Sequence, residues 1–239
     1  MLAGRDRLPV RAALSAGATV LLMARSPRRG EVRRALEPML GAERCVALQL
    51  ALIERALAWA AEVSPEPVQV AHDQPDAAAE FRAIAGPRAK LFPQNGEGIA
   101  ARLADASARL FARGAGPLLI VWPDLLRWRA DHASGAIDDL EHGCDLSLGP
   151  VFDGGLYLLA IARPLPELFG LPEQTWRNPD AMMVALAAAQ HAGLQVGILR
   201  SERALHHSAD IAAALADPLL ATELTAIVGR PGTRGEPPA

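Results

Sequence analysis

The chain has 239 residues, enough for one large or two small domains, and 51% of them are hydrophobic while only 4% are aromatic. Its net charge of −3 at neutral pH argues against a protein that binds nucleic acid. The two cysteines, Cys45 and Cys144, lack the spacing of metal ligands, and we therefore expect a reduced, cytoplasmic protein.

The N-terminal region imitates a signal peptide. Three arginines in the first eleven residues precede an apolar run over residues 12–24. Arg25 follows this run directly, and the segment Thr19–Met23 is better interpreted as a buried first strand. No other stretch is long and apolar enough to span a bilayer. We expect residues 1–16 to be loose, residues 17–228 to form one domain and residues 229–239 to be a disordered tail.

Strand and helix patterns alternate along the rest of the chain, which predicts a mostly parallel sheet with flanking helices. The longest helix is expected to pack through Val46, Leu50, Ile53 and Leu57. The predicted strands are Thr19–Met23, Val68–Ala71, Leu118–Trp122, Asp145–Leu148, Tyr157–Ile161 and Gln195–Leu199. The predicted helices are Ala42–Val63, Ile99–Ala112, Ser134–His142, Asp180–Ala192 and Ala209–Leu215.

One short turn breaks this alternation, because two apolar strands flank Asp153, Gly154 and Gly155. We expect an antiparallel pair here, within an otherwise parallel sheet. The glycines permit unusual backbone angles and the close approach of a ligand, so the carboxylate of Asp153 is a candidate for binding a divalent ion or a substrate hydroxyl. An ordinary Asp-Gly hairpin, with no ligand, explains the same residues.

Two further segments follow predicted strands. The loop over residues 23–34 carries five arginines, among them Arg25 and Arg33, and guanidinium groups suit the oxygens of a diphosphate. Asp124 follows the strand Leu118–Trp122, where it could share Mg²⁺ or Mn²⁺ with Asp153. A solvated basic loop and a carboxylate that caps a turn are the corresponding structural explanations.

Two weaker patterns remain. Gln94, Gly96 and Glu97 precede a predicted helix, where small residues let the backbone meet a base or ribose. His206 and His207 are adjacent and suggest a metal, but neighbouring side chains diverge, so we interpret them as a surface turn.

Taken in order, these segments resemble a bacterial domain-of-unknown-function family of glycosyltransferase-like proteins. Some of its members are labelled arsenosugar-biosynthesis or radical-SAM-associated transferases. The similarity runs from about Leu21 to Asp210 and is strongest at the turn around Asp153. It rests on the segments 22–27, 30–32, 36–41, 94–103 and 148–157, on Trp176 and on the block around Asp210. The resemblance implies a single-domain GT-A-like α/β fold, a three-layer sandwich whose mostly parallel mixed sheet carries helices on both faces. It also implies a nucleotide-diphospho-sugar donor and a divalent cation.

The chain also departs from the family pattern. Ala35, Gly98 and Ala204 stand where the family has functional arginine or acidic residues, and His206 lies within the segment where two late carboxylates are expected. Trp122 and Pro123 replace small residues beside Asp124. Because a small cation site depends on the number and charge of its ligands, these losses predict weaker metal binding.

Three hypotheses follow. In the first, the chain is a glycosyltransferase in which Asp153 and Asp124 act in catalysis and hold Mg²⁺ or Mn²⁺. The donor would then be held by Arg25, Arg33, Gln94, Gly96, Glu97, Gly154 and Gly155, and the acceptor would be a small molecule. In the second, the chain is a degenerate relative that binds a nucleotide or a protein partner without turnover. In the third, it is a nucleotidyltransferase acting on a small phosphorylated acceptor, which is less favoured because the first loop is rich in arginine rather than in glycine and lysine.

Overall fold

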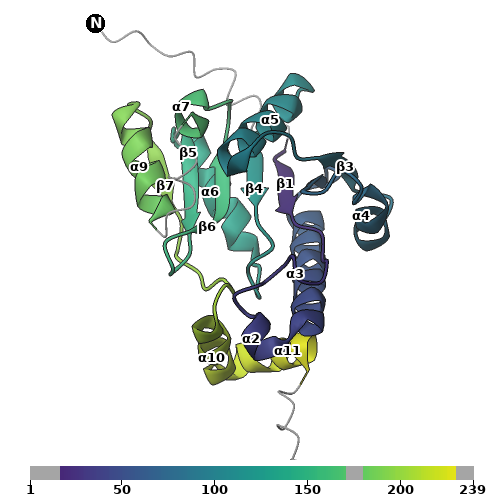
Figure 1. Ribbon diagram of the computed structural model, residues 1–239. Coiled ribbons are helices and arrows are strands. Elements are labelled where there is room, and N and C mark those ends of the chain that lie inside the picture. Colours follow the sequence, from purple (N-terminus) through teal and green to yellow (C-terminus); the bar gives the residue numbers. More distant parts are fainter. Residues whose placement is uncertain (1–16, 171–179, 230–239) are drawn as a thin grey trace, which may run out of the picture.

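The computed structural model describes residues 17–170 and 180–229, so the predictions for residues 1–16 and for Trp176, and most of the predicted tail, lie outside the described residues. A seven-stranded sheet runs through the molecule in the order β3-β2-β1-β4-β6-β5-β7 (Figure 1). Its strands are β1 (Thr19–Ala24), β2 (Gln69–His72), β3 (Lys90–Pro93), β4 (Leu118–Val121), β5 (Leu146–Pro150), β6 (Leu156–Ile161) and β7 (Val196–Ile198).

The direction of the strands confirms the mixed, mostly parallel sheet. Strand β6 is antiparallel to both of its neighbours, β4 and β5. The other four neighbouring pairs are parallel. The carboxyl ends of all the parallel strands therefore lie at one edge of the sheet, and the turn between β5 and β6 lies at the same edge.

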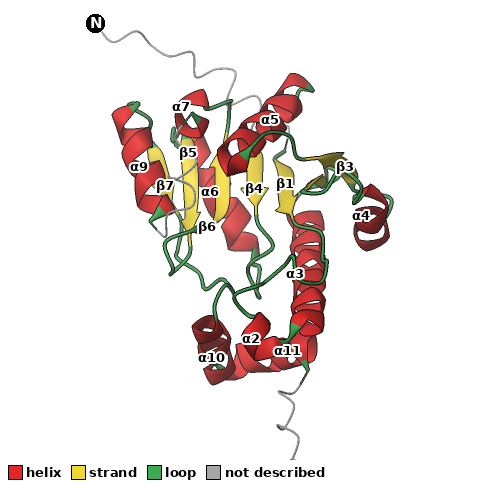
Figure 2. Cartoon of the chain, in the orientation of Figure 1, coloured by secondary structure: helices red, strands yellow, loops and turns green. Residues whose placement is uncertain are grey.

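Helices cover both faces of this sheet (Figure 2). The first face packs against α3 (Ala42–Val63), α4 (Ala78–Ala85) and α6 (Ala130–Glu141), in a core that includes Val20, Leu22, Ile53 and Phe81. The second packs against α5 (Gly98–Ala112), α7 (Pro166–Phe169) and α9 (Ala181–His191). Residues from β1 alternate between the two cores, as the pleat of a strand requires. The predicted three-layer α/β sandwich is confirmed.

A third group of helices lies beyond the carboxyl edge of the sheet (Figure 1). It comprises α2 (Glu37–Leu40), α10 (Ser208–Ala216), α11 (Pro218–Val228) and the first half of α3. Leu126 and Leu205, from the segments that follow β4 and β7, are buried among these helices. This small core holds both segments next to the sheet edge.

Three details differ from the sequence-based predictions. The pattern missed β3, a short edge strand whose central Phe92 is its only fully buried residue and which ends at Pro93. It also missed the helices α2, α4, α7 and α11. The predicted packing face of α3 was correct at Ile53 and in part at Leu57, which is partly buried against the core. The helix as a whole is buried along a different line, through Cys45, Leu48, Gln49, Leu52, Ile53, Ala56, Trp59 and Ala60. The helix contacts the sheet and also α2 and α11, so its apolar side is wider than a single stripe.

Candidate active site

Most of the residues predicted to bind a ligand lie along the carboxyl edge of the sheet. Arg25 follows β1, Gln94 follows β3 and Asp124 follows β4. Asp153 lies in the turn between β5 and β6, and His206 lies in the segment after β7. In open α/β sheets this edge is where ligands bind. The strand order places Gln94 at one end of the row and Asp153 towards the other.

Asp124 and Asp153 converge on one imidazole ring. The Nδ1 atom of His206 lies 2.5 Å from Oδ2 of Asp153, and its Nε2 atom lies 3.3 Å from Oδ2 of Asp124. We call Asp124, His206 and Asp153 the edge triad. All three side chains are between 21% and 30% exposed, so the triad is partly shielded from water yet reachable from it. The predicted convergence of the two carboxylates is observed, with a histidine between them.

The electrostatics of the triad favour charged forms of all three groups. Burial opposes ionisation of Asp124, but the neighbouring Arg33 and His206 outweigh it and hold the pKa of Asp124 well below its ordinary value. Burial also opposes ionisation of Asp153, and the hydrogen bond with His206 lowers its pKa overall. Burial alone would lower the pKa of His206, but the two carboxylates raise it to about 9. At neutral pH the triad is therefore an imidazolium between two carboxylates.

Arg33 anchors Asp124 from the other side. Its Nη2 atom donates to Oδ1 of Asp124 at 2.7 Å and to the backbone oxygen of Pro123 at 2.9 Å. Its other nitrogens donate to Oε1 of Gln49 and to the backbone oxygen of Leu205. The side chain is only 7% exposed, and its backbone adopts a left-handed conformation with φ of 51°. This guanidinium is directed into the protein, where it ties together the segments after β1, β4 and β7.

Arg25 is placed differently. Arg25 is exposed at the end of β1, and within the described residues it makes no hydrogen bond or ion pair through its guanidinium. Its backbone oxygen accepts from Nε2 of Gln49 at 3.1 Å, which fixes the position of the residue. Of the two arginines predicted to hold a diphosphate, Arg25 is therefore the one whose guanidinium faces solvent.

Gln94 and Gly96 lie at the far end of the same edge. The Nε2 atom of Gln94 donates to the backbone oxygens of Ala71 and Ala24, so this side chain closes the ends of β2 and β1. Gly96 has φ of 107°, and a Cβ atom there would lie 2.7 Å from Cβ of Ala101. The exposed Glu97 then begins α5 as its N-cap residue. These residues form a tight backbone turn about three strand spacings, or roughly 14 Å, from the end of β4.

The turn at Asp153 is a compact structure. The backbone nitrogen of Gly154 donates to the oxygen of Val151, and the nitrogen of Gly155 donates to Oδ1 of Asp153 at 3.3 Å. Gly154 adopts φ of 90°, which disfavours other residues at this position. The side chain of Asp153 is therefore fixed on both oxygens, by the backbone of its own turn and by His206.

His206 is the residue of this edge that the sequence analysis did not place in the site. The prediction of a surface turn was wrong for this residue, whose ring is held by two carboxylates from distant segments, although the neighbouring His207 is exposed. The backbone nitrogens of both histidines donate to Oδ2 of Asp210, which sets the orientation of the segment. The His-His-x-x-Asp spacing was a local signal of this arrangement, but the partners of the ring were not visible in it.

The predicted Mg²⁺ or Mn²⁺ does not fit the side chains as they are placed. Each oxygen of Asp124 and of Asp153 already accepts a hydrogen bond, from Arg33, His206 or Gly155. In residues 17–170 and 180–229 we find no group of three or more histidine, cysteine, aspartate or glutamate side chains arranged to hold a metal ion. The carboxylates of the edge triad are therefore held by groups of the protein itself.

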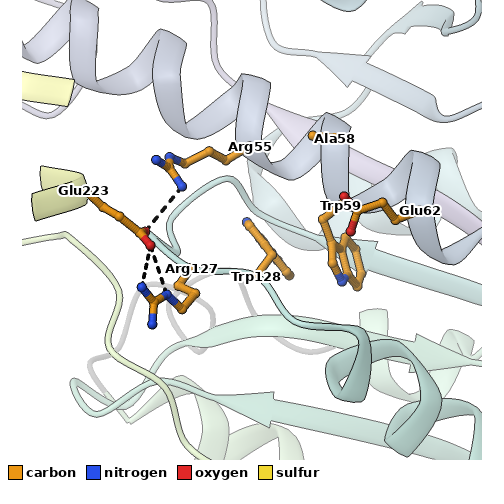
Figure 3. Close-up of a pocket in the computed structure, with 7 residues that line it drawn as sticks. All are labelled: Arg55, Ala58, Trp59, Glu62, Arg127, Trp128 and Glu223. Atoms are coloured by element: carbon orange, nitrogen blue, oxygen red, sulfur yellow. Dashed lines mark hydrogen bonds and ion pairs between the residues drawn. The ribbon is translucent and has the colours of Figure 1, made fainter. Parts of the chain in front are cut away.

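A second charged group lies between α3, α11 and the segment that follows β4, beside a cavity of about 400 Å³ (Figure 3). Glu223 accepts from Nη1 of Arg55 at 3.4 Å and from Nε of Arg127 at 3.2 Å, and we call these three residues the Glu223 cluster. The indole rings of Trp59 and Trp128 stack beside it, with ring centroids 4.5 Å apart. Glu62 and Ala58 complete the lining of the cavity.

Residues 56–172 match the model of a family described as "Uncharacterized protein conserved in bacteria (DUF2064)". The predicted resemblance to such a bacterial family is confirmed. This match covers both carboxylates of the edge triad and the segment Gln94–Glu97, whereas Arg33 and His206 lie outside it. No curated protein sequence matches the chain.

Solved structures show the same fold. A protein from Desulfovibrio desulfuricans G20, described as a candidate nucleotide-diphospho-sugar transferase, has a TM-score of 0.77 at 21% identity, over 88% of this chain and 96% of its own. Glucosyl-3-phosphoglycerate synthase from Mycobacterium tuberculosis, bound to Mn²⁺, UDP and glucosyl-3-phosphoglycerate, has a TM-score of 0.52 at 14% identity, over 98% of this chain and 88% of its own. A CMP:2-keto-3-deoxy-manno-octonic acid synthetase bound to CTP has a TM-score of 0.51 at 14% identity, over 86% of this chain and 99% of its own. The chain therefore shares the fold of these three structures.

None of the helices described between residues 17 and 170 or between 180 and 229 combines the length and the apolar character needed to cross a membrane.

Proposed function

We propose that this protein is a transferase that binds a nucleotide-diphospho-sugar donor along the carboxyl edge of its sheet. The observation that carries the proposal is the convergence of Asp124 and Asp153 at this edge, where Asp153 lies in a tight turn that continues through Gly154 and Gly155. The similar fold of the D. desulfuricans protein and of the M. tuberculosis enzyme that binds UDP supports the same class of ligand.

The donor is proposed to extend along the edge. The turn at Gln94, Gly96 and Glu97 is the proposed contact for the base and ribose, because its backbone is closely packed and its outer side is exposed. Arg25 would contact the diphosphate, since its exposed guanidinium suits phosphate oxygens. Asp153, beside Gly154 and Gly155, would then face the sugar and orient the hydroxyl of a small-molecule acceptor.

The role of Arg33 in this proposal is to position Asp124 rather than to bind phosphate. Four of its N–H groups are used within the protein, so its charge acts through Asp124. A carboxylate held in this way needs no rearrangement when a ligand arrives, which is the usual benefit of a preorganised polar site.

Isothermal calorimetry with UDP-, GDP- and dTDP-sugars, each in the presence of EDTA and then of Mn²⁺, tests the proposal. We expect one of these donors to bind, and the variant Arg25→Ala to weaken its binding by about tenfold, because a charge-assisted contact is lost. Arg29→Ala is the matched control, since Arg29 lies in the same loop but pairs with the exposed Glu43. Absence of binding by all three donors at millimolar concentration would contradict the proposal.

Turnover separates the proposed transferase from a binding protein without activity. The second function has one observation in its favour, because every carboxylate oxygen of the edge triad is already bound within the protein. Release of nucleoside diphosphate that is lost in Asp153→Asn supports the transferase. Donor binding without release, in the presence of a panel of acceptors, supports the binding protein. Pyrophosphate release from a nucleoside triphosphate would instead indicate a nucleotidyltransferase.

A further inference from the structure

His206 occupies the position between two carboxylates that a cation would otherwise take. Its two ring nitrogens each face a carboxylate oxygen, at 2.5 Å from Asp153 and 3.3 Å from Asp124. Each ring nitrogen is therefore engaged by a different carboxylate, and the ring fills the space between Asp124 and Asp153. In this arrangement neither nitrogen is open to a metal ion.

The charges around this position already balance. Two negative groups, Asp124 and Asp153, face two positive groups, Arg33 and His206. Affinity for a divalent cation depends on the number and charge of the ligands that surround it. Because Arg33 and His206 already neutralise the two carboxylates, a divalent metal ion would be only weakly attracted to the site. The metal ion would also have to displace the imidazole ring of His206.

The segment that carries His206 is held in place from several directions. Leu205 is buried, its nitrogen donates to the backbone oxygen of Asp124, and its own oxygen accepts from Arg33. On the other side, Oδ2 of Asp210 accepts from the backbone nitrogen of His206 at 3.2 Å. The ring is therefore directed between the carboxylates by the fold and is not a freely moving surface side chain.

From this geometry we infer that His206 excludes a divalent cation from the site and takes its place, so that the donor binds without a metal ion. The inference rests on the proposed function and specifies the conditions under which that function operates. It assigns to His206 the role of a positioning residue, which holds Asp124 and Asp153 at a fixed separation in front of the donor.

Titration of the full chain with Mn²⁺ alone, followed by the electron paramagnetic resonance signal of free Mn²⁺, tests the inference. We expect the wild-type chain to bind Mn²⁺ only in the millimolar range, and His206→Ala to bind it at least about tenfold more tightly, because removing the ring exposes two carboxylates. His206→Lys keeps a positive charge between the carboxylates and is expected to exclude Mn²⁺ as the wild type does.

Two further variants show where the ion binds. The double variant His206→Ala/Asp153→Asn is expected to lose the gained Mn²⁺ affinity, because one of the two carboxylates becomes neutral. His207→Asn is the matched control, since His207 is exposed and asparagine also caps the N-terminus of a helix. It is expected to leave Mn²⁺ binding as weak as in the wild type. Far-ultraviolet circular dichroism verifies that each variant is folded, and His206→Gln replaces His206→Ala if the smaller residue destabilises the fold.

The inference is overturned if the wild type binds Mn²⁺ as tightly as His206→Ala does, or if EDTA abolishes donor binding in the wild type. Failure of the proposed function gives a different result, namely that no donor binds with or without Mn²⁺. In that case the metal titration still decides whether His206 excludes the cation, because it requires no nucleotide.

Discussion

The edge triad and the Glu223 cluster are two groups of charged side chains in which the positive and negative charges are arranged in opposite ways. In the edge triad the imidazole ring of His206 lies between two carboxylates. In the Glu223 cluster a single carboxylate lies between two guanidinium groups. Both use residues that shortly follow β4, since Asp124 and Arg127 are only three positions apart. They differ in their surroundings. The carboxylates of both groups are similarly exposed, but Arg33, which supports the edge triad, is only 7% exposed, whereas both arginines of the Glu223 cluster are 36% exposed.

This contrast indicates where charge is structurally important. An exposed ion pair contributes little to stability because water and salt screen it, whereas removing one partner of a buried pair leaves an uncompensated charge. The edge triad should therefore respond strongly to the loss of its partners, and the Glu223 cluster should respond weakly. Three substitutions test this difference.

The largest effect is expected for Arg33→Ala. The substitution leaves the carboxylate of Asp124 and the buried amide of Gln49 without their partner, at a cost of about 3–5 kcal/mol in the free energy of unfolding. Urea denaturation measures this loss. Arg29→Ala, in the same loop but exposed, should change the free energy of unfolding by no more than about 0.5 kcal/mol. If the two variants were equally stable, Arg33 would not anchor the site.

A smaller effect, dependent on pH, is expected for His206. The pKa of its imidazole is raised from 6.5 to about 9, since Asp124 and Asp153 favour the charged ring. The unfolded chain loses this proton near pH 6.5 while the folded chain keeps it until about pH 9. The stabilisation is therefore complete below pH 6.5 and is lost as the pH rises through about 9. Because the ring is partly exposed, we expect a loss of about 2 kcal/mol.

Urea denaturation at pH 6.5 and at pH 9.5 measures this loss. The wild type should lose about 2 kcal/mol more than His206→Asn between the two values, because asparagine does not titrate. The other charged or titratable groups around the ring are Arg33, His207 and Asp210. His207→Asn should follow the wild type. If the wild type and His206→Asn lost the same free energy of unfolding between the two pH values, the pKa of the His206 imidazole would not be raised in the folded protein.

The smallest effect is expected for Glu223→Gln. The two guanidinium groups that contact Glu223 are exposed enough for water to replace it, so the free energy of unfolding should fall by less than about 1 kcal/mol. The same denaturation experiment at low and at high salt provides the measurement. A loss as large as that of Arg33→Ala would show that the two charged groups are equivalent and would remove the contrast between them.

Much of the fold could be predicted from the sequence, because its main strands are continuous apolar runs and its helices have clear apolar periodicity. The segment Thr19–Met23 is such a run, and all of β1 is buried. Strand β3 could not be found in this way, since it lies at an edge of the sheet and Lys90 and Pro93 interrupt its apolar character. An apolar run in the sequence indicates a buried strand, and the residues of an edge strand such as β3 are less buried.

The site was predictable only where its chemistry is local. Asp153 is recognisable because two glycines follow it at once, and Asp124 because it follows an apolar strand. Arg33 contacts Asp124, which lies 91 residues away along the chain, and His206 contacts Asp153, which lies 53 residues away. No short motif encodes such a contact. The sequence therefore predicted that Arg33 would bind a diphosphate, whereas in the structure its guanidinium is directed into the protein and holds Asp124.

The stacked indoles of Trp59 and Trp128 offer a spectroscopic consequence. Their rings are inclined by 29° and lie close enough for their electronic transitions to couple, and Trp128 follows Asp124 by only four residues. Far-ultraviolet circular dichroism of the unlabelled chain should therefore carry an exciton couplet from this pair, because the strongest indole transition lies in that range. Movement of the loop after β4 would alter the band, which gives the protein an intrinsic optical reporter of events at the neighbouring sheet edge.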